Sequence, residues 1–100
     1  MDRIVQVFSN VHMGYGHPGL SAILKKNIGR MFPKDGELFV FINKKKSAAK
    51  VYAAKNIVFH LKPESGRIEM HSILELPHAI GVDGTLNYSK ALELALKRKR

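Results

Sequence analysis

The spacing of apolar residues changes along the chain, and each change predicts a different element. Residues 4–8 (IVQVF) form a short run rich in β-branched side chains, which predicts a first strand ending at the polar pair Ser9–Asn10. After Pro18, apolar residues recur every three or four positions, a spacing typical of a helix of about three turns. These residues are Leu20, Ile23, Leu24, Ile28 and Met31.

From Glu37 onward the apolar period is two, which indicates strands joined by tight turns. The predicted strands are ELFVFIN at 37–43, AKVYAA at 49–54, IVFHLK at 57–62 and RIEMHSI at 67–73. Lys55–Asn56 and the PESG segment at 63–66 are expected to be turns. Alternation places Phe39 and Phe41 on one face of the first of these strands and its aliphatic residues on the other, so this strand is expected to lie centrally.

These elements predict an α+β fold with a twisted antiparallel sheet, a meander of four or five strands, backed by one N-terminal helix. Asp83–Gly84 begins a turn into a C-terminal helix on which Tyr88, Leu92 and Leu96 share a face. One hundred residues suffice for one core, so residues 1–100 are expected to form a single domain, with 97–100 as a disordered basic tail. Because so small a core has a thin stability margin, a homodimer is an open alternative.

The absence of cysteine excludes disulfides and thiolate chemistry and favours an intracellular setting. The N-terminal MDRIVQVF has no apolar stretch long enough for a signal peptide or a membrane span, so we expect a cytoplasmic protein without a membrane partner.

Charge changes this picture most, because 17 Lys and Arg stand against 8 Asp and Glu, a formal net charge of +9. No acid occurs between Glu37 and Glu64, and this interval holds Lys44, Lys45, Lys46, Lys50, Lys55 and Lys62. Cations that neutralise phosphates release condensed counterions, which gives affinity for nucleic acid of any sequence. DNA is therefore the expected partner, with RNA as an alternative.

The glycines in HMGYGHPGL match G-x-G-x-x-G, a spacing found in dinucleotide pockets. Such a pocket needs a glycine directly after a strand, a crossover into a parallel strand, and an acid at the end of that second strand. Residues 9–13 separate the first strand from Gly14, the next strand ends in Asn43, and hairpins are expected to follow, so the motif predicts no dinucleotide site. We expect instead a tight loop in which the glycines adopt positive φ, with a weak anion site at the helix start formed by Gly14, Tyr15, Gly16 and His17.

No residue spacing indicates a catalytic or metal site, so the protein is not expected to be an enzyme or to carry a cofactor. His12 and His17 lie five positions apart in a loop, which does not aim two imidazoles at one metal ion. An enzyme using His12, Tyr15 and His17 around an anion is the weakest alternative. The carboxylates Asp35, Glu37, Glu64, Glu69, Glu75 and Asp83 are expected to be turn and surface residues.

Three segments together resemble a known family: HMGYGHPGLSAI, GELFVFINKKKSAAK and FHLKPESGRI. The chain resembles the small accessory protein, TnpB or the second reading frame, of the insertion-sequence-sixty-six type of bacterial transposon. The residues that match the family's sequence blocks are Met13, Gly16, Gly19, Leu20, residues 38–41, Asn43, Lys44–Lys46, Lys50, Phe59, Leu61, Gly66 and Arg67. His12, Gly14, Tyr15 and Ser47 depart from them. The resemblance implies a protein that acts beside a transposase and binds DNA, with no catalytic residue.

The sequence thus predicts a nucleic-acid-binding accessory protein of DNA transposition, or of a related mobile-element or phage process. Its phosphate-contacting residues are predicted to be Lys44, Lys45, Lys46, Lys50, Lys55, Lys62, Arg67 and Asn43, converging on one side of the sheet. One alternative is a module that docks an acidic partner such as a transposase. Another is a binder of single strands or RNA, with Phe39, Phe41, Tyr52 and Phe59 as stacking platforms.

Overall fold

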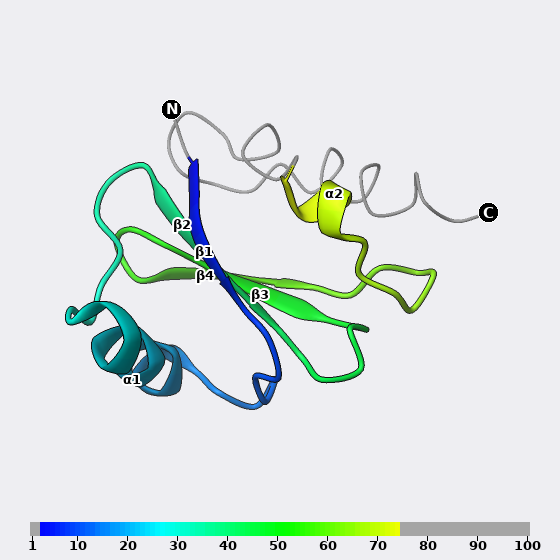
Figure 1. The fold of residues 1–100 in the computed structure, drawn as a ribbon, viewed down its shortest axis with the longest axis horizontal. Coiled ribbons are helices and arrows are strands. Elements are labelled where there is room, and N and C mark those ends of the chain that lie inside the picture. Colours follow the sequence, from blue (N-terminus) through cyan, green and yellow to red (C-terminus); the bar gives the residue numbers. More distant parts are fainter. Residues whose placement is uncertain (1–2, 75–100) are drawn as a thin grey trace.

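The computed structural model describes residues 3–74, which form a β–α–β unit followed by two strands and a short helix (Figure 1). The elements are β1 (Arg3–Phe8), α1 (His17–Ile28), β2 (Glu37–Ile42), β3 (Ala49–Ala53), β4 (Ile57–Leu61) and α2 (Met70–Leu74). The predicted C-terminal helix and the basic tail at 97–100 lie outside the described residues. The predicted α+β class is confirmed for the described part of the chain.

The four strands form one mixed sheet in the order β1-β2-β3-β4. β2, β3 and β4 pair antiparallel as predicted, but β1 pairs parallel with β2. The prediction of a wholly antiparallel sheet is therefore wrong at its first strand. Its physical cause is α1, because a connection that contains a helix is long enough to return the chain to the same end of the sheet.

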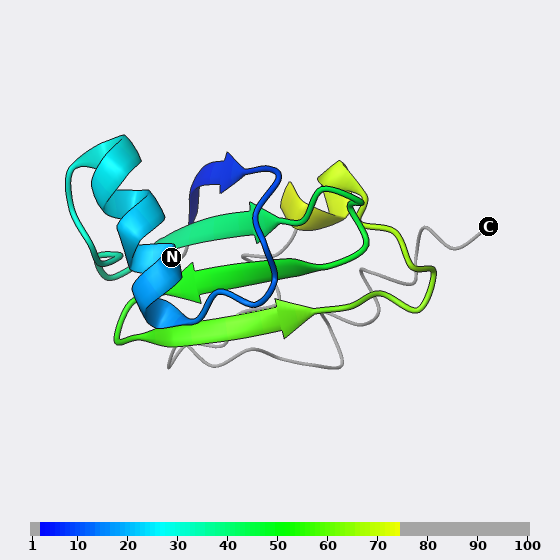
Figure 2. The ribbon, with the colours of Figure 1, turned by 90° about the horizontal axis from the view of Figure 1, so that it is seen from below.

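Both faces of β2 are covered, so every residue of this strand is buried and its predicted central place is confirmed. On one face Phe39, Phe41 and Tyr52 pack with Leu20 and Leu24 of α1. The opposite face carries the mainly aliphatic cluster of Leu38, Val40, Ile42, Val51 and Phe59, over which Ile73 of α2 packs. Figure 1 shows α1 and α2 on opposite sides of the sheet. Figure 2 shows α1 lying across the strands near the start of β2.

Local signals set the ends of α1. Pro18 occupies the first turn, where its missing N–H costs no hydrogen bond, and Gly29 ends the helix with φ 80° while its N–H donates to the Lys25 carbonyl at 3.1 Å. Met31, predicted to continue the apolar stripe, lies beyond this cap and is exposed. The turn between β3 and β4 is confirmed, since Lys55 and Asn56 both adopt positive φ.

Residues 67–73 do not form the predicted strand. The Ile68 N–H donates to the Lys46 carbonyl at 2.6 Å, and the chain then turns into α2. A further strand beside β4 would leave the aliphatic face of the sheet open to water. Ile68 and Ile73 pack on that face instead, and this burial outweighs the weak strand pattern.

Candidate nucleic-acid interface

The side chain of Asn43 shapes the turn between β2 and β3. Its Oδ1 accepts hydrogen bonds from the backbone N–H groups of Ser47 at 2.8 Å and Ala48 at 3.2 Å, and its Nδ2 donates to Ser47 Oγ at 2.9 Å. Lys46, inside this turn, adopts φ 56°, a value that Asn and Gly tolerate better than most residues. The Asn43 amide, predicted to contact nucleic acid, is thus occupied in holding the turn that exposes Lys44, Lys45 and Lys46.

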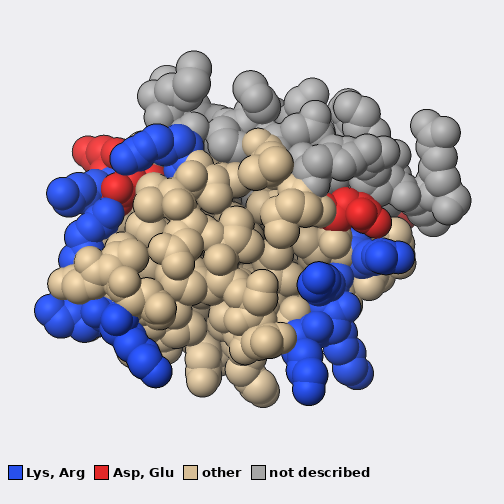
Figure 3. Space-filling model, in the orientation of Figure 1, with Lys and Arg blue, Asp and Glu red and all other residues tan. Residues whose placement is uncertain are grey.

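Two more predicted cations lie at the same end of the sheet. Lys62 directly follows β4, whose last residue, Leu61, pairs with Ala49 at the start of β3. Arg67 precedes Ile68, whose N–H is bonded to the Lys46 carbonyl. We call the group Lys44, Lys45, Lys46, Lys62 and Arg67 the basic end. Figure 3 shows Lys and Arg side chains at this end of the molecule and also at the opposite end.

Carboxylates near the basic end compensate little of its charge. Arg67 Nε lies 3.6 Å from Glu69 Oε1, but the Arg67 side chain is 77% exposed, and such surface pairs contribute little free energy. His60, opposite Lys50 in the sheet, responds to the cations around it. Burial lowers the pKa of His60 below its ordinary value, and the positive charges of Lys50 and Lys62 lower it further.

The prediction that all these cations share one side is wrong for two of them. Lys50 points to the α1 face, where its Nζ donates to the Tyr15 carbonyl at 2.7 Å. Lys55 lies in the turn at the far end of β3, beside Asn56, whose carbonyl bonds the His17 ring. The two residues differ from the others for different reasons. Lys50 lies at the start of β3 but on the face toward Tyr15, whereas Lys55 follows Ala53, at the opposite end of β3 from the β2–β3 turn.

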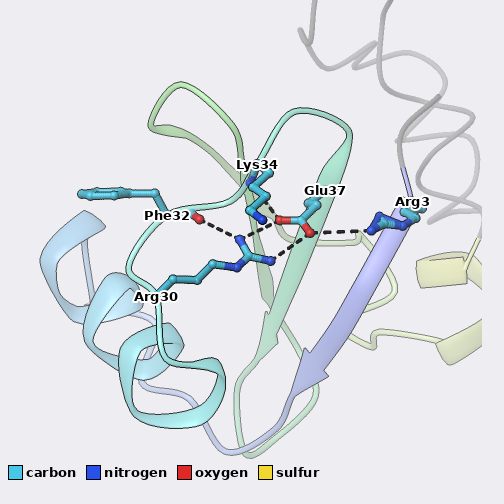
Figure 4. A network of polar contacts seen from close by, with 5 residues as sticks. All are labelled: Arg3, Arg30, Phe32, Lys34 and Glu37. Atoms are coloured by element: carbon cyan, nitrogen blue, oxygen red, sulfur yellow. Dashed lines mark hydrogen bonds and ion pairs between the residues drawn. The ribbon is translucent and has the colours of Figure 1, made fainter.

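A second group of cations, Arg3, Arg30, Lys34 and Lys55, lies near the start of β2. The sequence alone did not indicate this group. Here Arg30 binds the Glu37 carboxylate with both nitrogens of its fork, from Nη2 to Oε2 at 2.8 Å and with Nη1 2.7 Å from Oε1 (Figure 4). The Lys34 N–H donates to Oε1 at 2.8 Å, and Arg3 Nη2 lies 3.6 Å from Oε2.

Glu37 was predicted to be a surface residue, but its side chain is only 8% exposed. The hydrogen bond from Arg30 lowers the pKa of the Glu37 carboxyl, an effect that burial opposes and that the Lys34 N–H and the charge of Arg3 reinforce. Glu37 therefore joins the loop after α1 to the first residues of β2 and β1. Among the described residues, the ion pairs at this end join Arg30 and Arg3 to the buried Glu37, whereas the ion pair at the basic end is the exposed one of Arg67 with Glu69.

The glycine loop is built differently from the prediction. Among described glycines, positive φ occurs at Gly29, Gly36 and Gly66, and not at Gly14, Gly16 or Gly19. Close side chains explain two of the three: a Cβ on Gly14 would lie 2.9 Å from the His12 ring, and one on Gly19 2.8 Å from Tyr15 Cγ. Contrary to the prediction, a parallel crossover does follow this loop. The residues that separate β1 from Gly14 nevertheless differ from the dinucleotide arrangement.

The four aromatic residues considered as stacking platforms are buried. Phe39, Phe41 and Tyr52 are fully enclosed, and Phe59 is nearly so. Their burial contradicts the alternative in which these four rings stack on bases in the folded chain. Tyr52 also uses its hydroxyl inside the protein, bonding Ser21 Oγ at 2.9 Å and Asn56 Oδ1 at 3.1 Å.

A hollow of about 400 Å³ opens beside the basic end, lined by residues 10–14 and 43–45. It brings part of the glycine loop, His12 and Gly14, together with Lys44 and Lys45 of the β2–β3 turn. Tyr15, Gly16 and His17, the rest of the predicted anion loop, are not part of its lining. Sequence reasoning missed this juxtaposition because it depends on the parallel pairing of β1 with β2.

In residues 3–74, no group of three or more histidine and carboxylate side chains is placed to share a metal ion. Neither α1 nor α2, the helices described, is long and apolar enough to cross a membrane. Comparison with known protein families, with curated proteins and with solved structures found no match.

Proposed function

We propose that the protein binds the phosphate backbone of nucleic acid, in the first place DNA, through the basic end. The observation that carries this proposal is the convergence of cations from three segments: the β2–β3 turn, the residue after β4, and residue 67. Of the charged residues in the described chain, twelve are Lys or Arg and four are Asp or Glu. Such an excess attracts polyanions, and cations on turns can reach phosphate oxygens without reading bases.

The resemblance to the transposon accessory protein supports a role for this binding in DNA transposition or a related mobile-element process. The types of residue at the basic end suit contacts with the phosphate backbone of DNA better than contacts with its bases. Its members are long flexible cations, and the neighbouring Asn43, a residue type that can read base edges, is held within its own turn. We therefore propose affinity with little sequence preference.

Salt dependence tests the proposal. If each of the five cations of the basic end neutralises one phosphate, the log–log slope of duplex affinity against salt should be about −4.5. Replacing the turn lysines by Lys44→Gln, Lys45→Gln and Lys46→Asn should reduce that slope in magnitude by about 2.7. Asn is chosen at 46 because it tolerates the positive φ of this position. Fluorescence anisotropy with labelled duplexes over a range of salt measures both slopes.

The matched control removes the same charge elsewhere, by Lys25→Gln, Lys26→Gln and Lys34→Gln. These residues lie on α1 and in the loop after it, away from the basic end. An equal loss of affinity in both variants would show that net charge alone drives binding and would remove the basic end from the proposal. The docking module would be favoured instead if the protein bound neither duplex nor single strands at low salt and captured an acidic protein in a complex that nuclease treatment does not disrupt.

A further inference from the structure

The hollow beside the basic end lies at the carboxyl ends of two parallel strands. The chain leaves β1 toward α1 and leaves β2 toward β3, so the two segments diverge and a space opens between them. The Val11 N–H donates to the Ile42 carbonyl at 3.0 Å, which fixes the first segment against the end of β2. In sheets with parallel strands, ligands commonly bind outside the carboxyl ends where connections diverge.

His12 is held in one tautomer at this hollow. The Gly14 N–H donates to His12 Nδ1 at 3.0 Å, so Nδ1 is an acceptor and the ring carries its proton on Nε2. The ring lies so close to the backbone of Gly14 that a Cβ there would be 2.9 Å from it. Because Gly14 has no side chain, the His12 ring can lie in this position, with its Nε2–H as a hydrogen-bond donor.

The lining of the hollow carries positive charge. Lys44 and Lys45 contribute two ammonium groups, Asn10 contributes an amide, and the described residues that form the lining include no carboxylate. The volume of about 400 Å³ is within the range of small-molecule sites and can admit a phosphorylated sugar. A phosphate monoester carries close to two negative charges and three strong acceptor oxygens, more than a diester within a strand. It can therefore engage ammonium, imidazole and amide donors together.

We propose that this hollow binds a phosphate monoester, with His12 Nε2–H, Lys44 and Lys45 as its donors. Two kinds of ligand carry such a monoester: a nucleic-acid strand with a terminal phosphate, and a free nucleoside monophosphate. The strand-end form rests on the proposed function and deepens it, because it gives the protein a preference for cut ends over continuous backbone. The free-nucleotide form stands without it.

Single strands of one sequence, ending in a 5′-phosphate, a 3′-phosphate or hydroxyls only, test the strand-end form. Anisotropy titrations should show about tenfold tighter binding of at least one phosphorylated strand. His12→Asn places an amide oxygen where Nδ1 accepts from Gly14 and removes the Nε2 donor, so it should abolish most of this preference. Its affinity for the hydroxyl-ended strand should not change. His60→Asn is the matched control, since His60 lies on β4 and does not line the hollow.

Nitrogen-15 NMR titration with inorganic phosphate and with a nucleoside 5′-monophosphate tests the free form. Saturable shifts of the Gly14, Lys44 and Lys45 amides are expected in the wild-type protein. The Lys44 and Lys45 shifts should be lost in Gly14→Ala, in which the His12 ring must move. Shifts without any preference among strands would assign the hollow to free nucleotides. Neither shifts nor preference would overturn the inference while leaving duplex binding, if observed, intact. Shifts without duplex binding would overturn the proposed function alone.

Discussion

Replacing Tyr52 by alanine should lower the free energy of unfolding by about 3–5 kcal/mol, the cost typical of removing a large buried ring. Tyr52 is fully enclosed between α1 and the sheet, where it packs with Leu20, Leu24 and Phe39. Its hydroxyl also joins Ser21 of α1 to Asn56 of the β3–β4 turn. Denaturant unfolding followed by circular dichroism, wild type against variant, measures the loss.

The conservative variant Tyr52→Phe separates ring from hydroxyl. It keeps the packing but leaves the buried Ser21 hydroxyl without its partner, so a loss of about 1–2 kcal/mol is expected. Tyr15→Phe is the matched control: Tyr15 is 44% exposed, and the change should stay within about 0.5 kcal/mol. A Tyr52→Ala protein of unchanged stability that no longer binds single strands would contradict the packing and revive the stacking alternative.

Replacing Glu37 by glutamine should cost about 2–3 kcal/mol at neutral pH. The change keeps the shape of the side chain but removes the charge that Arg30 and Arg3 face, and Arg30 loses a bidentate partner. The figure is below that for a fully buried pair because Arg30 is one-third exposed and can partly regain water. Thermal or denaturant unfolding at neutral pH measures this loss.

The Glu37 carboxylate also predicts that the protein loses stability at acid pH. The folded pKa of Glu37 lies below its ordinary value of 4.5, chiefly because of the hydrogen bond from Arg30. Its contribution is therefore present above about pH 4.5 and is lost as pH falls through the folded pKa. Wild type should lose stability in this acid range, and Glu37→Gln should lose less of it. Glu64→Gln, in the exposed turn after β4, is the control and should keep the wild-type profile. Identical acid profiles for wild type and Glu37→Gln would contradict the network.

The elements with strong local signals could be predicted from the sequence. Alternation in ELFVFI predicted that Phe39 and Phe41 share one face of β2 and the aliphatic residues the other, and Lys55–Asn56 marked the β3–β4 turn. The RIEMHSI segment was misassigned because its alternation is weak, and the uncovered aliphatic face of the sheet decided its course. Local periodicity reports which side of an element is apolar, but it does not report what will cover that side.

The candidate site, like the fold, could be predicted only in part from the sequence. The sequence by itself determined the charge of the β2–β3 turn, since three successive lysines must lie in any short polar connection between two buried strands. Only the tertiary structure decided that Lys62 and Arg67 join this turn while Lys55 lies at the far end, because strand register sets those distances. It also decided that β1 runs parallel to β2, which places His12 beside Lys44, and that Arg30 and Arg3 reach a buried Glu37. These relations join residues distant in the chain, and their free energy depends on partners that a local pattern does not contain.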